Sequence, residues 1–331
     1  MKILVTVPKN DFFDSFFNDE CISAINSMGE AEWNDTEYDF TPCQLREKLK
    51  DVDVCFCGWG TTKFDSDVLE NADKLKIIAY TAGSVANLVD DAVFDKGIKV
   101  LSGNKVFAES VAEGVLAYIL TSLRRIPHYN DIMHNGGWQN DDFYNGGLLD
   151  KTVGIVSFGA IAKYLVTLIK PFRVKIKVYS RYISDEDKEK YGVEQVPLDE
   201  IFSTCDVISI HTAQNPRTLH MIDKKYLQLI KKDALFINTS RGSVVNEEDL
   251  INELSEKRFS AVLDVYEYEP LDKLSPLRDM DNVVLMPHMA GPTLDRRSFV
   301  TRALVDDVNR YYNNQLMNNE VAREYALNMT R

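Results

Sequence analysis

The feature that most constrains the fold of this chain is its alternation of short apolar, β-branched runs with helical patterns. Continuous apolar strands that alternate with helices are typical of parallel sheets covered by helices on both faces. The sequence therefore predicts an α/β fold built from doubly wound parallel sheets. The expected strands are residues 3–7, 52–57, 75–80, 153–157, 176–180, 207–211, 234–238, 260–263 and 283–286.

These runs fall into two groups, one before residue 101 and one after residue 151. The length of 331 residues also suits two medium-sized domains. Residues 293–312 have a helical pattern that could return the chain from the second domain to the first. We therefore expect a first domain of residues 1–102 plus 295–331 and a second domain of residues 103–294. The second domain begins with a long helix at 104–125, followed by a Gly- and Asn-rich arm at 126–147.

Charge and composition exclude several classes of partner. The chain has 38 Lys+Arg against 51 Asp+Glu, a net charge of -13, and it has no basic block, so nucleic acid and anionic membranes are not expected partners. No run approaches the roughly 18 apolar residues of a membrane span. The N-terminus is typical of a first strand rather than a signal peptide, which predicts a cytoplasmic protein.

The five cysteines are expected to be reduced and mostly structural in that setting. Cys55 and Cys57 are two positions apart in an expected strand, so they should share one of its faces. Two cysteines at this spacing without histidines do not make a zinc site, and no metal is predicted.

The turn after the expected strand 153–157 is a candidate dinucleotide-binding turn. The G-x-G-x-x-G/A fingerprint joins a strand to a helix and lets the backbone approach a pyrophosphate at the helix N-terminus. This chain has Ser157, Gly159 and Ala162 at the three positions, so the first glycine is replaced. The match is incomplete, and an ordinary strand–turn–helix is the alternative.

The next expected strand ends at Ser180 and Arg181, where an NAD-binding unit places Asp or Glu on the ribose hydroxyls. A hydroxyl followed by a guanidinium suits a ribose 2′-phosphate instead. The sequence therefore predicts that NADP(H) is preferred and that NAD(H) is possible. Alternatively, Arg181 is a solvated loop cation, and the nearby acids at 185–187 would oppose a phosphate.

Titratable residues follow apolar strands in three further segments, residues 235–246, 263–270 and 282–293. That position is the carboxyl edge of a parallel sheet, where ligands bind. In order and spacing, and together with residues 110–113 and 211–218, these segments resemble the D-isomer-specific 2-hydroxyacid dehydrogenase family over essentially the whole chain. The resemblance implies two Rossmann-like domains with an interdomain cleft. It also implies a homodimer formed through the long helix and the arm around Trp138.

The resemblance assigns catalytic roles to three residues. Arg241 is expected to bind the substrate carboxylate and carbonyl oxygen, since a guanidinium fork can contact both. His288 is expected to be the acid/base, and Glu269 to orient it and favour its protonated form. Glu269 also argues against a formate dehydrogenase, which uses Gln there. Glu267 is expected to be solvated.

The resemblance also predicts residues that bind substrate and cofactor. Gly83, Ser84 and Val85 are expected to hold the substrate carboxylate, and Trp59, between two glycines, to line the pocket. Asp264 matches the residue that receives the nicotinamide carboxamide, although it could be a structural acid at a strand end. The expected cofactor-binding residues are Val111, Ser157, Phe158, Gly159, Ala160, Ile161, Ser180, Arg181, His211, Thr212, Ala213, Thr218, Thr239, Ser240, Asp264, His288 and Gly291.

These features predict NAD(P)H-dependent reduction of a small 2-oxo acid to a D-2-hydroxy acid. The loops at 58–61 and 81–87 contain no Lys or Arg, which favours glyoxylate, hydroxypyruvate or a larger apolar acid over a phosphorylated one. The alternatives are a dinucleotide-sensing regulator similar to the family's corepressors and a dehydrogenase of an unusual sugar-derived acid. Because the sequence ends at Arg331, regulation through an added C-terminal domain is not expected.

Overall fold

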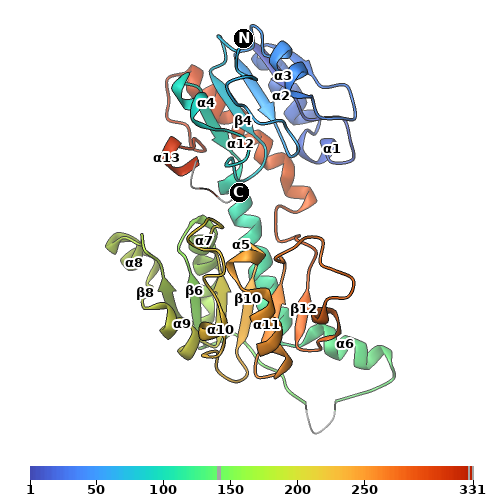
Figure 1. Ribbon diagram of the computed structural model, residues 1–331, viewed down its shortest axis with the longest axis vertical. Helices are drawn as coiled ribbons and strands as arrows, with labels where there is room; N and C mark the ends of the chain where they lie inside the picture. Colours follow the sequence, from blue (N-terminus) through green and yellow to red (C-terminus); the bar gives the residue numbers. More distant parts are fainter. Residues whose placement is uncertain (140–142, 327–328, 330–331) are drawn as a thin grey trace. The chain divides into compact units, whose positions relative to one another are not determined.

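The structure is a computed structural model that describes residues 1–139, 143–326 and 329. The chain divides into two compact units, residues 1–107 with 292–331 and residues 108–291. The sequence placed the crossovers near residues 102 and 295. Each unit contains one parallel sheet (Figure 1), which confirms the predicted fold class.

The first unit contains a five-stranded sheet in the order β2-β1-β3-β4-β5. The strand order reverses between β1 and β3, as in doubly wound sheets. Its strands are β1 (Lys2–Val5), β2 (Glu30–Trp33), β3 (Val54–Cys57), β4 (Ile77–Tyr80) and β5 (Lys99–Ser102). Its helices are α1 (Phe13–Phe16), α2 (Asp19–Met28), α3 (Pro42–Lys48), α4 (Asp91–Asp95), the 3-10 turn Leu294–Arg296, α12 (Arg297–Tyr312) and α13 (Arg323–Ala326).

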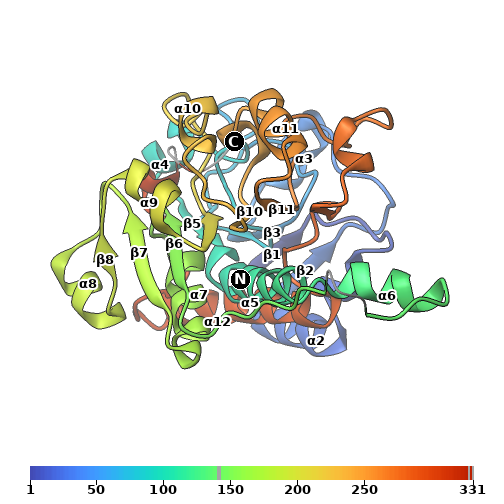
Figure 2. The same cartoon turned by 90° about the horizontal axis from the view of Figure 1, so that it is seen from below.

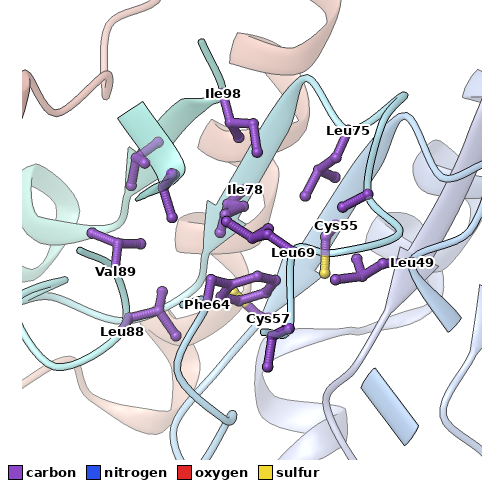
Figure 3. Packing of buried hydrophobic residues seen from close by; sticks show 14 of the residues in the cluster. Leu49, Cys55, Cys57, Phe64, Leu69, Leu75, Ile78, Leu88, Val89 and Ile98 are labelled. Atoms are coloured by element: carbon purple, nitrogen blue, oxygen red, sulfur yellow. The ribbon is translucent and has the colours of Figure 1, made fainter. Parts of the chain in front are cut away.

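Helices cover both faces of this sheet because its strands alternate apolar side chains between two buried clusters. One cluster joins the strands to α1, α2 and α12. The other joins them to α3, α4 and α13. Cys55 and Cys57 both lie in the second cluster, near Phe64, Leu69 and Ile78 (Figure 3), which confirms that they share a face.

The second unit contains a seven-stranded sheet in the order β12-β11-β10-β9-β6-β7-β8, and the strand order reverses between β6 and β9. Its strands are β6 (Thr152–Val156), β7 (Lys175–Tyr179), β8 (Glu194–Gln195), β9 (Val207–Ile210), β10 (Leu235–Asn238), β11 (Ser260–Leu263) and β12 (Val283–Leu285). Its helices are α5 (Asn104–Leu123, entering from the first unit), α6 (Ile126–His134), α7 (Ala160–Ile169), α8 (Asp185–Tyr191), α9 (Leu198–Thr204), α10 (Lys224–Leu227) and α11 (Glu247–Ser255), with 3-10 turns at Lys170–Phe172, Gly242–Val244 and Pro276–Asp279.

Three strands lay outside the predicted set, namely β2, β5 and β8. All three are edge strands, and β8 has only two residues. Every residue of β2 is at least partly exposed, so it carries no continuous apolar run that a sequence pattern could reveal. The helix expected from residue 293 begins as a 3-10 turn and becomes α-helical only at Arg297.

Helix α5 corrects another expectation. By length and composition alone it is long and apolar enough to cross a membrane, although no such run was expected. Ala112, Val115 and Ile119 are buried against the seven-stranded sheet, so its apolar residues contribute to the core of this unit. The arm that follows contains α6, which has no buried residue. Figures 1 and 2 show α6 extending away from the sheet of its unit, and residues 140–142 of the arm lie outside the described residues.

Candidate active site

Three loops at the carboxyl edge of the seven-stranded sheet bring the predicted catalytic residues together. Arg241, Glu269 and His288 lie beyond β10, β11 and β12, which are neighbouring strands. Nδ1 of His288 lies 2.7 Å from Oε2 of Glu269. The other carboxylate oxygen of Glu269 accepts a 3.1 Å hydrogen bond from the backbone N–H of Tyr266. Both side chains are partly exposed, so Nε2 of His288 can meet a ligand.

Arg241 is held by its own loop. Its guanidinium donates to the carbonyl of Ser240 at 2.7 Å, and its carbonyl accepts from the side-chain amide of Asn238 at 3.1 Å. Burial lowers the pKa of Arg241, and the negative charge of Glu269 partly restores it. A guanidinium keeps its charge in proteins, so Arg241 can bind an anion near Glu269.

Gly242 allows the loops that carry Arg241 and Glu269 to approach each other closely. A Cβ at Gly242 would lie 1.8 Å from the carbonyl carbon of Tyr266 and 2.3 Å from the backbone nitrogen of Glu267. No side chain fits there unless the backbones move. This contact fixes the loop after β10 against the loop after β11.

Asp264 and Tyr266 anchor the loop that carries His288. Asp264 is buried, and its two oxygens accept from the N–H groups of Met289 at 2.8 Å and Ala290 at 2.9 Å. Burial is the main cause that raises the pKa of Asp264, and the two backbone bonds oppose it. The Tyr266 hydroxyl lies 2.9 Å from the carbonyl of Met286. Asp264 thus positions the His288 loop, while its predicted contact with the carboxamide stays a prediction.

The turn after β6 has the geometry expected of a dinucleotide-binding turn. Ser157, in place of the first glycine, adopts a φ of 76° and forms a 2.9 Å hydrogen bond with the hydroxyl of Thr212. A Cβ at Gly159 would meet no atom within 4 Å. Helix α7 begins there without a side-chain cap, so its first N–H groups can donate hydrogen bonds to a phosphate. Ala160 and Ile161 lie in its first turn, and these residues fit a pyrophosphate.

Comparison with known proteins identifies the family. Residues 116–290 match the model of the D-isomer specific 2-hydroxyacid dehydrogenase NAD binding domain. The chain belongs to this family. D-3-phosphoglycerate dehydrogenase of Methanocaldococcus jannaschii is 32% identical over 97% of this chain, which spans 59% of that protein's length. Glyoxylate reductase of Thermococcus litoralis is 37% identical over 76% of this chain and 78% of its own.

The fold also matches solved structures. The structure of an acyclic imino acid reductase (Bsp5) in complex with NADPH and D-Arg has a TM-score of 0.80 at 24% identity, with 97% of this chain and 100% of that chain covered. This likeness shows the fold. The family model indicates a nicotinamide dinucleotide as the cofactor of residues 116–290.

In this member of the family, the residues after β7 leave Arg181 available to a ligand. Arg181 is exposed and makes no ion pair within residues 1–139, 143–326 and 329. Two of the acids expected to oppose a phosphate are paired, Asp187 with Lys163 at 2.8 Å and Asp185 with Lys188. The Ser180 hydroxyl accepts weakly from the N–H of Tyr182 at 3.3 Å.

In the loop after β9, most residues predicted to bind the cofactor form hydrogen bonds within the protein itself. Nε2 of His211 lies 2.9 Å from the hydroxyl of Ser209, and burial lowers the pKa of His211 to about 4. The hydroxyl of Thr218 donates to the carbonyl of Ala213 at 2.7 Å. Thr239, after β10, is different because its buried hydroxyl has no hydrogen-bond partner in the described part of the chain.

The other predicted cofactor residues occupy varied positions. Val111 is buried in the core between α5 and the sheet. Phe158 packs edge-on against Tyr191, with ring centroids 5.5 Å apart. Ser240 donates to the side-chain oxygen of Asn238, and a Cβ at Gly291 would meet no atom within 4 Å.

The predicted substrate residues lie in the first unit, after β3 and β4. Trp59 is 47% exposed and contacts Phe16 and Phe107 edge-on, with centroids at 5.2 and 6.1 Å. A Cβ at Gly83 would have ordinary contacts only, and the Ser84 hydroxyl accepts from the N–H of Ala86 at 3.4 Å. Val85 is fully buried, so only its backbone could bind a substrate.

The structure corrects one prediction and adds positioning residues. Glu267 is not simply solvated: its carboxylate lies 2.8 Å from Nε2 of His220. Asn238, Tyr266 and Tyr118, whose hydroxyl lies 3.5 Å from Asp264, were not predicted as site residues. Their positions in the sequence could have indicated two of them, because Asn238 ends a strand and Tyr266 lies in the same motif as Asp264.

Proposed function

We propose that this protein reduces a small 2-oxo acid to the D-2-hydroxy acid with NADPH or NADH. The observation that carries this proposal is the 2.7 Å contact between His288 and Glu269, close to the charged Arg241. An acid/base beside an anion-binding guanidinium is what carbonyl reduction next to a carboxylate requires. The names of the two relatives, a phosphoglycerate dehydrogenase and a glyoxylate reductase, support this substrate class.

The residues act on the two ends of the reacting group. A nicotinamide dinucleotide, when bound, would supply the hydride that C2 of the 2-oxo acid accepts. Arg241 binds the carboxylate and the carbonyl oxygen through its planar fork. His288 donates the Nε2 proton to that oxygen, and Glu269 stabilises the imidazolium through its contact with Nδ1. In the oxidative direction, the neutral imidazole takes the proton back.

The test follows NADPH and NADH absorbance with glyoxylate, hydroxypyruvate, pyruvate, 2-oxoisocaproate and phenylpyruvate. We expect at least one acid to be reduced. His288→Asn should lower kcat by roughly 10²–10⁴, because it removes the proton donor and leaves an amide near Glu269. His128→Asn, on exposed α6, is the matched control. Unchanged turnover in His288→Asn would refute the proposal. Cofactor binding without reduction of any acid would favour the dinucleotide sensor.

We further propose that NADP(H) is the preferred cofactor, supported by exposed Arg181 and by the ion pairs of Asp185 and Asp187. The likeness to an NADPH complex agrees with this choice. Arg181→Gln should raise KM for NADPH about tenfold, the size of one charge-assisted hydrogen bond, and leave KM for NADH nearly constant. Equal effects on both cofactors, or a wild-type preference for NADH, would contradict it.

A further inference from the structure

Arg297, the first residue of α12, lies among aromatic rings of its own unit. The carbon at the centre of its guanidinium lies 5.3 Å from the ring centroid of Phe12, and 5.4 Å from those of Phe16 and Trp59. One guanidinium nitrogen donates to the hydroxyl of Ser15 at 3.3 Å. Its Nε is buried and has no hydrogen-bond partner among the described residues.

No carboxylate balances this charge within residues 1–139, 143–326 and 329. Burial lowers the pKa of Arg297, and no neighbouring acid counteracts this shift. Arg302 of the same helix pairs with Glu20, and Arg310 lies near Asp307. A partly buried cation without an acidic partner is unusual in a chain of net charge -13, because its desolvation is offset here only by cation–π contacts and one hydrogen bond to Ser15.

A row of contacts connects Arg297 with the predicted substrate loop. Trp59 contacts both the guanidinium and the ring of Phe107, whose centroid lies 6.1 Å from that of Trp59. Phe107 in turn lies 3.9 Å from the position that a Cβ at Gly83 would occupy. Arg297 is therefore at the far end of an aromatic surface that begins at Gly83.

We propose that Arg297 binds a second anionic group, a carboxylate or a phosphate, at the end of the substrate remote from its 2-oxo acid group. The stem between the two groups lies along Trp59. This inference rests on the proposed reduction of 2-oxo acids and names the substrate class. It revises the sequence argument against a phosphorylated substrate. That argument considered only cations within the loops at 58–61 and 81–87, whereas Arg297 lies near the other end of the chain.

The experiment compares substrates with and without a second anionic group: 2-oxoglutarate with its isosteric amide 2-oxoglutaramate, and 3-phosphohydroxypyruvate with hydroxypyruvate. We expect the wild type to have kcat/KM at least about tenfold higher for the member of one pair that carries the second anionic group, mainly through KM. The pair that shows the effect identifies carboxylate or phosphate. Arg297→Gln should abolish this preference, and Arg297→Lys should restore part of it.

Arg302→Gln, on the same helix, is the control and should keep the preference. Equal rates for the two members of each pair in the wild type, or an unchanged preference in Arg297→Gln, would overturn the inference. Failure to reduce any acid would instead refute the proposed function. In that case the role of Arg297 is tested by thermal unfolding with glutarate and with butyrate. In the wild type, glutarate should raise the Tm more than butyrate does. If glutarate raises the Tm of Arg297→Gln as much as that of the wild type, the role of Arg297 is refuted.

Discussion

Individual side chains at the edge of the seven-stranded sheet are fixed by short contacts with the backbone of neighbouring loops. Asp264 accepts from two N–H groups beyond His288, and Glu269 accepts from Tyr266. Both residues, and the contact of Glu269 with His288, were predicted through the family resemblance, but these backbone partners were not. Ser157 shows the same limit, because its left-handed φ and its bond to Thr212 depend on the folded turn.

His211 gives a prediction of pH dependence at this scale. Its pKa falls from 6.5 to about 4 on burial, so below pH 6.5 the unfolded chain binds a proton that the folded chain does not. Its contribution to stability is therefore lost as the pH falls from 6.5 to 4. When the pH is lowered from 7.5 to 5.5, the free energy of unfolding measured with urea should fall by about 1.4 kcal/mol more in the wild type than in His211→Gln. The same loss in both proteins would show that the ring is not buried as a neutral group.

Elements of the second unit place the site through strand order. β10, β11 and β12 are parallel neighbours, so the loops at their carboxyl ends meet at one edge. The close approach at Gly242 then sets how far Arg241 lies from Glu269. The parallel strands followed from the sequence pattern, whereas their order and this backbone contact could not be read from it.

Gly242→Ala tests the contact between these loops. The added Cβ must displace the backbone near Tyr266, and overpacking of this kind costs about 1–3 kcal/mol. Because misplacement by about 1 Å can cost 10²-fold in rate, we expect a comparable fall in kcat/KM and a lower Tm. Gly147→Ala is the control, since its Cβ would meet no atom within 4 Å. Wild-type kinetics in Gly242→Ala would show that the loop spacing is unimportant.

At the scale of the whole molecule, the arm exposes apolar surface that its own unit does not cover. Ile126 and Met133 of α6 are 54% and 52% exposed, and Trp138 beyond it is 72% exposed. Surfaces of this kind commonly mark interaction sites. We therefore propose that the arm and α5 form a homodimer, as the family resemblance implies.

Light scattering after size exclusion tests this proposal. We expect the wild type to be a dimer and the double variant Ile126→Glu, Met133→Glu to be largely monomeric, because charges would be buried in the interface. Leu274→Glu, at a residue 91% exposed elsewhere in the same unit, should remain dimeric. A monomeric wild type, or a dimeric double variant, would refute a dimer formed through the arm.

The sequence by itself determined the parallel α/β architecture and the nine main strands, and through the family resemblance it predicted Arg241, Glu269 and His288 as the catalytic residues. Each of these depends on local patterns, because apolar runs encode burial and the motif residues follow strand ends directly. Only the tertiary structure decided the edge strands β2, β5 and β8, the pairing of Glu267 with His220 and the place of Arg297 beside Trp59. Such contacts join segments distant in sequence, and they depend on strand register and loop geometry that local periodicity does not encode.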